Sequence, residues 1–138
     1  MSGKTKPRCI LDSHAILAWL QGEAGGAVVA DLFERARHGD TLLSMCVVNS
    51  GEVLCIIERE ESVQAAQIAP ATIDGLPVRQ VNASRDITLQ AAHYNAAYWM
   101  SYADCFGMAL ARQLGVGLVT GDPELRTQDE VTLLWIGP

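Results

Sequence analysis

Four acidic residues of the chain lie beside or within apolar segments: Asp12, Glu52, Asp104 and Asp122. Asp12 directly follows the apolar residues 9–11, and Asp122 follows the segment "GLVT" after one glycine. Asp104 begins the segment "DCFGMALARQLG", and Glu52 lies within "VVNSGEVLCII". Because ligands of open α/β sheets bind where strands finish and helices begin, we expect these carboxylates to converge at one edge of a sheet.

Each acid also has an ordinary structural role that the sequence allows. Asp12 can cap the helix that follows it, and Ser101 with Asp104 has the spacing of a capping box. Asp122 precedes a proline, which is typical of a helix start. Glu52 is harder to assign to structure, because no Lys or Arg lies three or four residues away from it. An exposed position on its helix is the alternative for Glu52.

Charge repulsion among four neighbouring carboxylates favours a bound cation. Two carboxylates about 5 Å apart repel by roughly 3 kcal/mol at an effective dielectric constant of about 20. Several such pairs would offset a large part of a typical stability of about 5–15 kcal/mol. A multivalent cation or a partner's basic side chain would remove this repulsion, and a ligand set of oxygens alone favours Mg²⁺ or Mn²⁺ over Zn²⁺. Phosphodiester hydrolysis is a reaction for which proteins use such ions.

The elements that would position these acids follow from the apolar patterns. Buried strands are predicted at residues 9–11, 41–44, 76–81, 117–120 and 131–136. Helices are predicted at residues 15–20, 27–38, 47–60, 63–73, 85–97 and 103–114, with an interruption of the fourth helix at Pro70. Strands that alternate with helices indicate an α/β fold, a three-layer α/β/α sandwich with a mostly parallel central sheet.

Length, composition and charge restrict the class of protein further. The 138 residues fit one domain, 1–138, with residues 1–7 expected to form a flexible tail. The chain has no apolar run long enough for a membrane helix and no secretory signal, and its four cysteines form no Cys-x-x-Cys pair, so a cytoplasmic location is expected. A net charge of −6 argues against a simple nucleic-acid-binding module, but not against an enzyme that meets phosphates through cations.

Taken together, the four acidic motifs resemble those of the PIN-domain nucleases, and among them the VapC-type toxins of bacterial toxin–antitoxin systems. The resemblance covers nearly the whole chain and rests on "ILDSHAIL", "SGEVL", "ADCFGMALARQLG" and "LVTGDPEL". It implies a PIN-like fold and a ribonuclease that depends on Mg²⁺, with Mn²⁺ able to substitute. The catalytic and metal-binding residues that it implies are Asp12, Glu52, Asp104 and Asp122.

The same resemblance implies supporting residues and partners. The hydroxyl groups of Ser13 and Thr120 match the small residues found beside the acids of this family. The implied partners are an RNA substrate, a cognate antitoxin that blocks the acidic pocket, often with an Arg, and a second copy of the chain in a homodimer. The aromatic segment "HYNAAYWMSY" before Asp104 departs from the family pattern. Its role is packing or a dimer contact on one interpretation, and a platform for unpaired bases on the other.

Other functions compatible with an α/β layout fit the sequence less well. A receiver-type phosphoacceptor requires a Lys near the last strands, whereas every Lys here lies within the first six residues. A haloacid-dehalogenase-type phosphatase requires a second Asp two residues after Asp12, where this chain has His14. The remaining alternative is a catalytically silent PIN-fold module for binding or scaffolding. Four intact acids argue against it, because a silent site has no physical reason to keep charges that repel one another.

Overall fold

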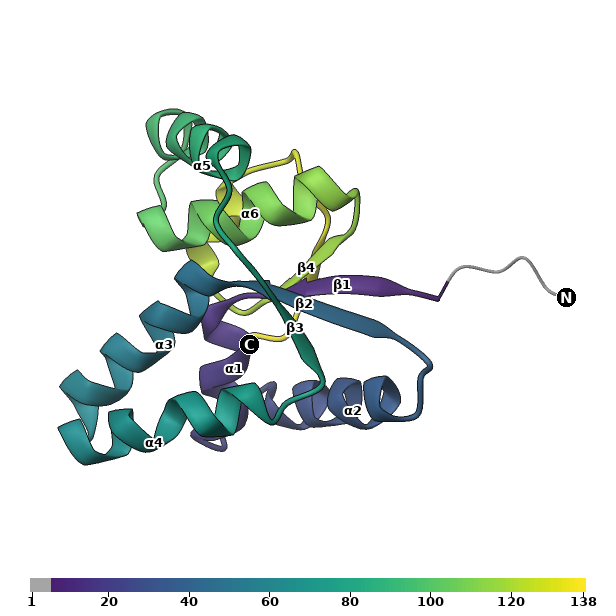
Figure 1. Cartoon of the computed structure of the whole chain (residues 1–138). Coiled ribbons are helices and arrows are strands. Elements are labelled where there is room, and N and C mark those ends of the chain that lie inside the picture. Colours follow the sequence, from purple (N-terminus) through teal and green to yellow (C-terminus); the bar gives the residue numbers. More distant parts are fainter. Residues whose placement is uncertain (1–5) are drawn as a thin grey trace, which may run out of the picture.

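The structure, a computed structural model, describes residues 6–138 and forms a three-layer α/β/α sandwich around a five-stranded sheet (Figure 1). The strand order is β3-β2-β1-β4-β5, and neighbouring strands run parallel in every pair, which confirms the predicted mostly parallel sheet. The strands are β1 (Arg8–Leu11), β2 (Leu42–Cys46), β3 (Val78–Val81), β4 (Gly117–Thr120) and β5 (Leu133–Trp135). Positions 1–5 of the expected flexible tail lie outside the described residues.

Helices cover both faces of the sheet. One face carries α1 (Ser13–Leu20), α2 (Gly26–Arg37), α3 (Val47–Glu60) and α4 (Val63–Asp74). The opposite face carries α6 (Tyr102–Leu114), and α5 (Arg85–Ala97) packs on the outer side of α6 (Figure 1). A short 3-10 helix, η1 (Pro123–Thr127), follows β4. Within residues 6–138, no helix combines the length and the apolar character that crossing a membrane requires.

The predicted interruption at Pro70 is wrong, because α4 continues through this residue to Asp74. Proline inside a helix removes one backbone hydrogen bond and costs roughly 3 kcal/mol. The helix persists because Ala69 and Ile73, on both sides of Pro70, are buried in the core that α4 shares with α3. Tertiary packing therefore outweighs the local preference of proline.

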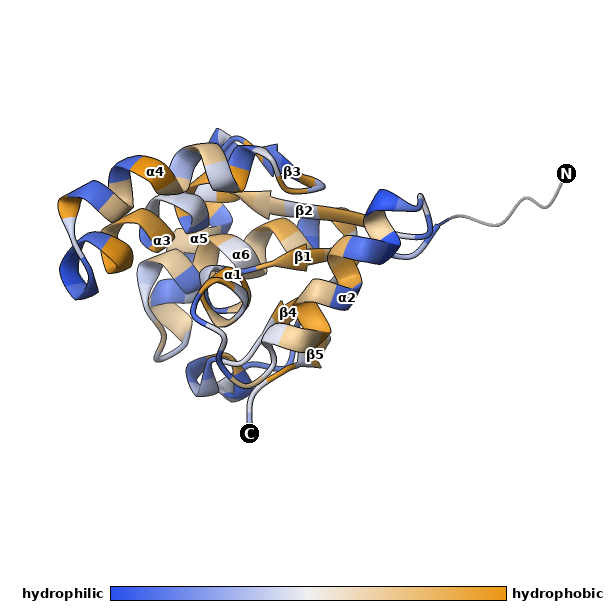
Figure 2. Cartoon of the chain, turned by 90° about the horizontal axis from the view of Figure 1, so that it is seen from below, coloured by the Kyte–Doolittle hydropathy of each residue, from blue (hydrophilic) through white to orange (hydrophobic). Residues whose placement is uncertain are grey.

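The alternation of side chains along β1 divides the core into two clusters. Cys9 and Leu11 pack with α1–α4, whereas Ile10 packs with α5 and α6. Figure 2 shows hydrophobic colours along the central strands and alternating polar and hydrophobic residues along the outer helix α4. The parallel arrangement directs the carboxyl ends of β1 and β4 to the same edge of the sheet, which is where the acidic residues follow.

Candidate metal centre

The loops after β1 and β4 bring Asp12 and Asp122 to one edge of the sheet. The strands pair in parallel, with Leu11 beside Val119, and the backbone N–H of Asp12 donates to the carbonyl of Val119 at 3.3 Å. Asp122 follows β4 after Gly121. The first turn of α6 adds Asp104 to this edge, since a carboxylate oxygen of Asp104 lies within 4.8 Å of one of Asp122.

Glu124 completes the closest group of acids, although it was not among the site residues predicted from the sequence. Single carboxylate oxygens of Asp104, Asp122 and Glu124 all lie within 4.8 Å of one another. Glu124 lies in the first turn of η1, two residues after Asp122. The only signal in the sequence is this short acidic spacing in "GDPEL".

Asp12 is both a helix cap and a buried acid with a free oxygen. Its Oδ1 accepts the backbone N–H of Ala15 at 2.9 Å, as expected of an N-cap. Its Oδ2 is buried and has no hydrogen-bond partner among the described residues. Capping therefore explains only one of the two oxygens, and the other remains available for a ligand.

Asp104 likewise has an oxygen that its helix start does not use. The hydroxyl of Ser101 accepts the backbone N–H of Asp104 at 3.2 Å, which is half of the expected capping box. The return bond is made by Glu124, whose carboxylate accepts the backbone N–H of Ser101 at 3.0 Å. Asp104 Oδ2 stays buried without a partner in the described part of the chain.

Glu52 joins the site from the neighbouring helix α3. It is half-buried, and one of its carboxylate oxygens accepts a hydrogen bond from the hydroxyl of Ser13 on α1. Ser13 directly follows Asp12, and the charge of Glu52 acts to raise the pKa of Asp12. Glu52 is thus not a fully exposed helix residue, although the closest group of three acids does not include it.

Buried polar side chains hold the elements of the site together. The hydroxyl of Thr120 accepts the backbone N–H of Asp122 at 3.0 Å and fixes the loop after β4. Asn49 on α3 donates to the carbonyl of Ala103 at 3.0 Å and so connects the helix of Glu52 to the first turn of α6. At Gly107 the absence of a side chain permits close packing, because an added Cβ would lie 3.3 Å from Asn49 Oδ1.

The surroundings of these acids favour either their protonated form or the binding of a cation to their carboxylates. Burial raises the pKa of Asp12 to about 7; the charges of Asp122 and Glu52 act in the same direction, whereas the Thr120 hydroxyl and the Ala15 N–H lower it. Burial and the nearby Asp122 carboxylate also raise the pKa of Asp104. Two unpartnered buried oxygens beside a group of carboxylates fit a hard divalent cation, whose preferred ligands are oxygens.

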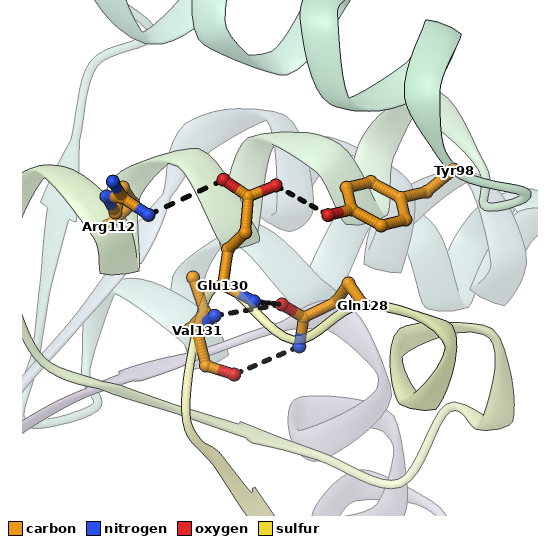
Figure 3. Close-up of polar contacts among 5 residues, drawn as sticks. All are labelled: Tyr98, Arg112, Gln128, Glu130 and Val131. Atoms are coloured by element: carbon orange, nitrogen blue, oxygen red, sulfur yellow. Dashed lines mark hydrogen bonds and ion pairs between the residues drawn. The ribbon is translucent and has the colours of Figure 1, made fainter.

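The aromatic residues before Asp104 divide into packed and exposed members. Tyr94 is fully buried, and the hydroxyl of Tyr98 donates to Glu130 at 2.6 Å (Figure 3). The second carboxylate oxygen of Glu130 lies 3.5 Å from Nη1 of Arg112 on α6 (Figure 3). This ion pair connects the segment after η1 to α6. Trp99, by contrast, is 92% exposed and lies two residues before Ser101. Packing thus accounts for the two tyrosines but not for the tryptophan.

Comparison with known proteins assigns the family of this chain. The sequence model of the PIN domain matches residues 9–131, so the chain belongs to the PIN domain family, as its motifs predicted. A similar solved structure is VapC20 of Mycobacterium tuberculosis, a toxin that cleaves the sarcin-ricin loop, with 18% identity, a TM-score of 0.68, and coverage of 90% of this chain and 98% of that one.

Two further solved structures are similar in fold. VapBC2 of Rickettsia felis, bound to a DNA fragment from its promoter, has 10% identity and a TM-score of 0.69 over 91% of this chain and 96% of that one. FitAcB of Neisseria gonorrhoeae has 15% identity and a TM-score of 0.64 over 91% and 95% of the two chains. Curated proteins compared by sequence give no match. At these identities the likeness establishes the PIN fold.

Proposed function

We propose that the protein is a ribonuclease that hydrolyses phosphodiester bonds with a divalent cation, Mg²⁺ or Mn²⁺, and that it acts as the toxin of a toxin–antitoxin pair. The observation that carries the proposal is the group of carboxylates of Asp104, Asp122 and Glu124, in which one oxygen of Asp104 is buried and unpartnered. Asp12 adds a second buried, unpartnered oxygen at the same edge of the sheet, and the charge of Asp122 acts to raise the pKa of Asp12. Without a positive charge this arrangement is costly, because burial and like charges both disfavour ionised carboxylates.

In this proposal Asp12, Asp104, Asp122 and Glu124 hold the cation. A cation bound there would act as a Lewis acid toward the phosphoryl oxygens and would lower the pKa of a water molecule. Glu52, held in place by the Ser13 hydroxyl, accepts a proton from water at the edge of the site.

Exposed aromatic side chains beside the acids support a single-stranded substrate. Trp99 is 92% exposed and Tyr102 is 49% exposed, and the Tyr102 ring packs edge-on against Phe106 with centroids 5.0 Å apart. The bond from Ser101 to Glu124 ties this segment to the acidic group. Base stacking on aromatic rings contributes roughly 1–3 kcal/mol per base, and this contribution comes from the ring faces and not from positive charge. It is therefore compatible with a net charge of −6.

The proposed partners follow from the resemblance and from the similar structures. Several of these are toxin–antitoxin complexes, among them one from Klebsiella pneumoniae. We propose that a cognate antitoxin covers the acidic edge of this protein and presents a basic side chain where the cation would bind. The homodimer expected from the sequence stays a prediction, to be measured by sedimentation.

The test is cleavage of defined RNAs by the purified protein. We expect cutting in Mn²⁺, none in EDTA, and none by the Asp12→Asn variant. Glu58→Gln, which neutralises an exposed acid on the same helix as Glu52, serves as the matched control and should retain activity. Cutting that survives EDTA, or that persists in Asp12→Asn, would overturn the proposal.

A further inference from the structure

The sheet face that lies under α6 carries charged residues at its amino-terminal end. Strand alternation places residues 8, 10, 42, 44, 79 and 81 on this face, with Arg8 beside Leu42 and Ser44 beside both Ile10 and Arg79. Parallel strands covered on both faces normally read as continuous apolar runs. Arg8 and Arg79 both depart from this rule on the same face and are exposed, which marks this end of the face as incompletely covered.

A cavity of about 320 Å³ opens above these residues, between the sheet and the helices α5 and α6. This sheet-face cavity has apolar walls made by Ile10, Val81, Ile87, Leu110, Leu114 and Val116. Arg8, Arg79, Asn82 and Gln113 add polar groups to its lining. Leu42 lines the cavity as well, and Leu42 and Leu114 remain 48% and 38% exposed, so apolar surface is left open to solvent there. Small-molecule sites typically combine such walls with a few polar groups in cavities of about this size.

Among residues 6–138, neither arginine of the cavity forms an ion pair with an acid. The ion pairs of the described residues are Arg37–Glu34 and Arg112–Glu130, and residues 1–5 contain no acid. Arg8 and Arg79 lie on the strands that flank β2, with Cα atoms about 12 Å apart by strand spacing and rise. Both guanidinium groups can therefore reach one ligand seated over Leu42 and Ser44.

We propose that the sheet-face cavity binds a small amphipathic carboxylate, a single anionic head joined to an apolar body. The guanidinium groups of Arg8 and Arg79 hold the head by charge-assisted hydrogen bonds, and the apolar walls remove the body from water. The site is separate from the acidic edge, because Arg8 begins β1 and Asp12 follows the end of this strand, about 13 Å away along it. It does not depend on nuclease activity.

The test uses octanoate, with octanol and acetate as matched probes that lack the charge or the apolar body. We expect saturable one-to-one binding of octanoate by calorimetry, and affinities at least tenfold weaker for the other two. Arg8→Gln and Arg79→Gln should each weaken octanoate binding roughly tenfold. Arg59→Gln, at an exposed position on α3, should not. Equal binding of octanoate and octanol, or no loss in either cavity variant, would overturn the proposal.

Methyl NMR of the unaltered protein locates the ligand without any substitution. Octanoate should shift the methyl signals of Ile10, Leu110 and Leu114 and leave that of Ile68, which is 66% exposed on α4, unchanged. Shifts at Ile68 instead would show nonspecific binding to exposed apolar residues and would overturn the proposal. The proposal would also be overturned if a short RNA shifted the methyl signals of the cavity and octanoate did not, because the arginines would then bind nucleic acid.

Discussion

The backbone N–H of Ser101 donates a hydrogen bond of 3.0 Å to the carboxylate of Glu124, a residue 23 positions further along the chain. Glu124, a residue outside α6, thus accepts the free backbone N–H at the start of this helix. Asp104, in the first turn of the helix, is not used for that bond, and its Oδ2 has no partner among the described residues. One carboxylate thereby caps α6 and also lies within 4.8 Å of Asp104 and Asp122. The start of α6 and the candidate metal centre are consequently built from the same groups.

Glu124→Gln should separate these two roles. The amide oxygen can still accept the Ser101 N–H, so the melting temperature in EDTA should change little. The affinity for Mn²⁺ should fall roughly tenfold or more, since a loss of about 1.4 kcal/mol is sufficient for that factor. Calorimetric titration with Mn²⁺ measures this, and Glu34→Gln on the exposed face of α2 is the control. Unchanged Mn²⁺ affinity would remove Glu124 from the metal centre.

Asp12→Asn and Asp104→Asn should abolish the stabilisation by Mn²⁺ without destabilising the metal-free protein. A cation that binds only the native state adds about 2.7 kcal/mol at 100 times its dissociation constant. Asparagine caps a helix as well as aspartate does, so Asp12→Asn keeps the cap of α1, whereas the cap of α6 is Ser101 and is untouched by Asp104→Asn. Both substitutions remove a buried acid. The melting temperature in EDTA should therefore stay level or rise, while the increase with Mn²⁺ disappears.

Asp12→Ala provides the contrast, because it also removes the bond from Ala15 N–H to Asp12 and should cost about 1 kcal/mol. Differential scanning fluorimetry with and without Mn²⁺ distinguishes the variants. A metal-free melting temperature that fell by many degrees in both asparagine variants would favour a purely structural role for these acids.

The sequence predicts the strands, the helices and the placement of Asp12 and Asp122 at one edge of the sheet, because each depends on local pattern and on a general rule for parallel sheets. Helix α3 and strand β4 have the predicted limits, 47–60 and 117–120. The site role of Glu124 could not be predicted, because its hydrogen bond to Ser101 joins residues that only the folded chain brings together. Asn49 was missed for the same reason, since a buried amide and an exposed one look alike in the sequence.

The sheet-face cavity could not be predicted from the sequence, and the reason is the topology of the sheet. Arg8 and Arg79 share one face of the sheet only because the strand order is β3-β2-β1-β4-β5. Apolar periodicity identifies strands but does not give their order or register. Residues 71 positions apart on non-neighbouring strands therefore cannot be paired by pattern alone.

The metal-free protein should lose stability as the pH rises from about 4 to about 7. Burial raises the pKa of Asp12 from 3.8 to about 7 in the native state. Over this interval the unfolded chain has released the proton that Asp12 still binds in the native state, so the free energy of unfolding falls with rising pH. The contribution of Asp12 levels off above about 7, whereas that of Asp104, whose pKa is also raised, continues at higher pH. Between pH 5.5 and pH 8, Asp12 alone should account for about 2 kcal/mol.

Urea unfolding in EDTA at these two pH values measures the effect. Asp12→Asn should show a smaller difference between them, and the raised pKa of Asp104 explains the part that remains. Stability that rises across this interval, or an equal pH dependence in the variant, would contradict the assignment of the proton to Asp12.

Trp99→Ala should weaken substrate binding and leave the fold intact. The side chain is 92% exposed, so its removal should change the free energy of unfolding by less than about 0.5 kcal/mol. If an unpaired base stacks on the indole ring, KM for a single-stranded RNA should rise roughly tenfold with kcat unchanged. Trp99→Phe should restore most of the affinity, and Leu89→Ala, another exposed apolar position, is the control. An unchanged KM together with a lower sedimentation mass would instead assign Trp99 to a contact between two copies of the chain.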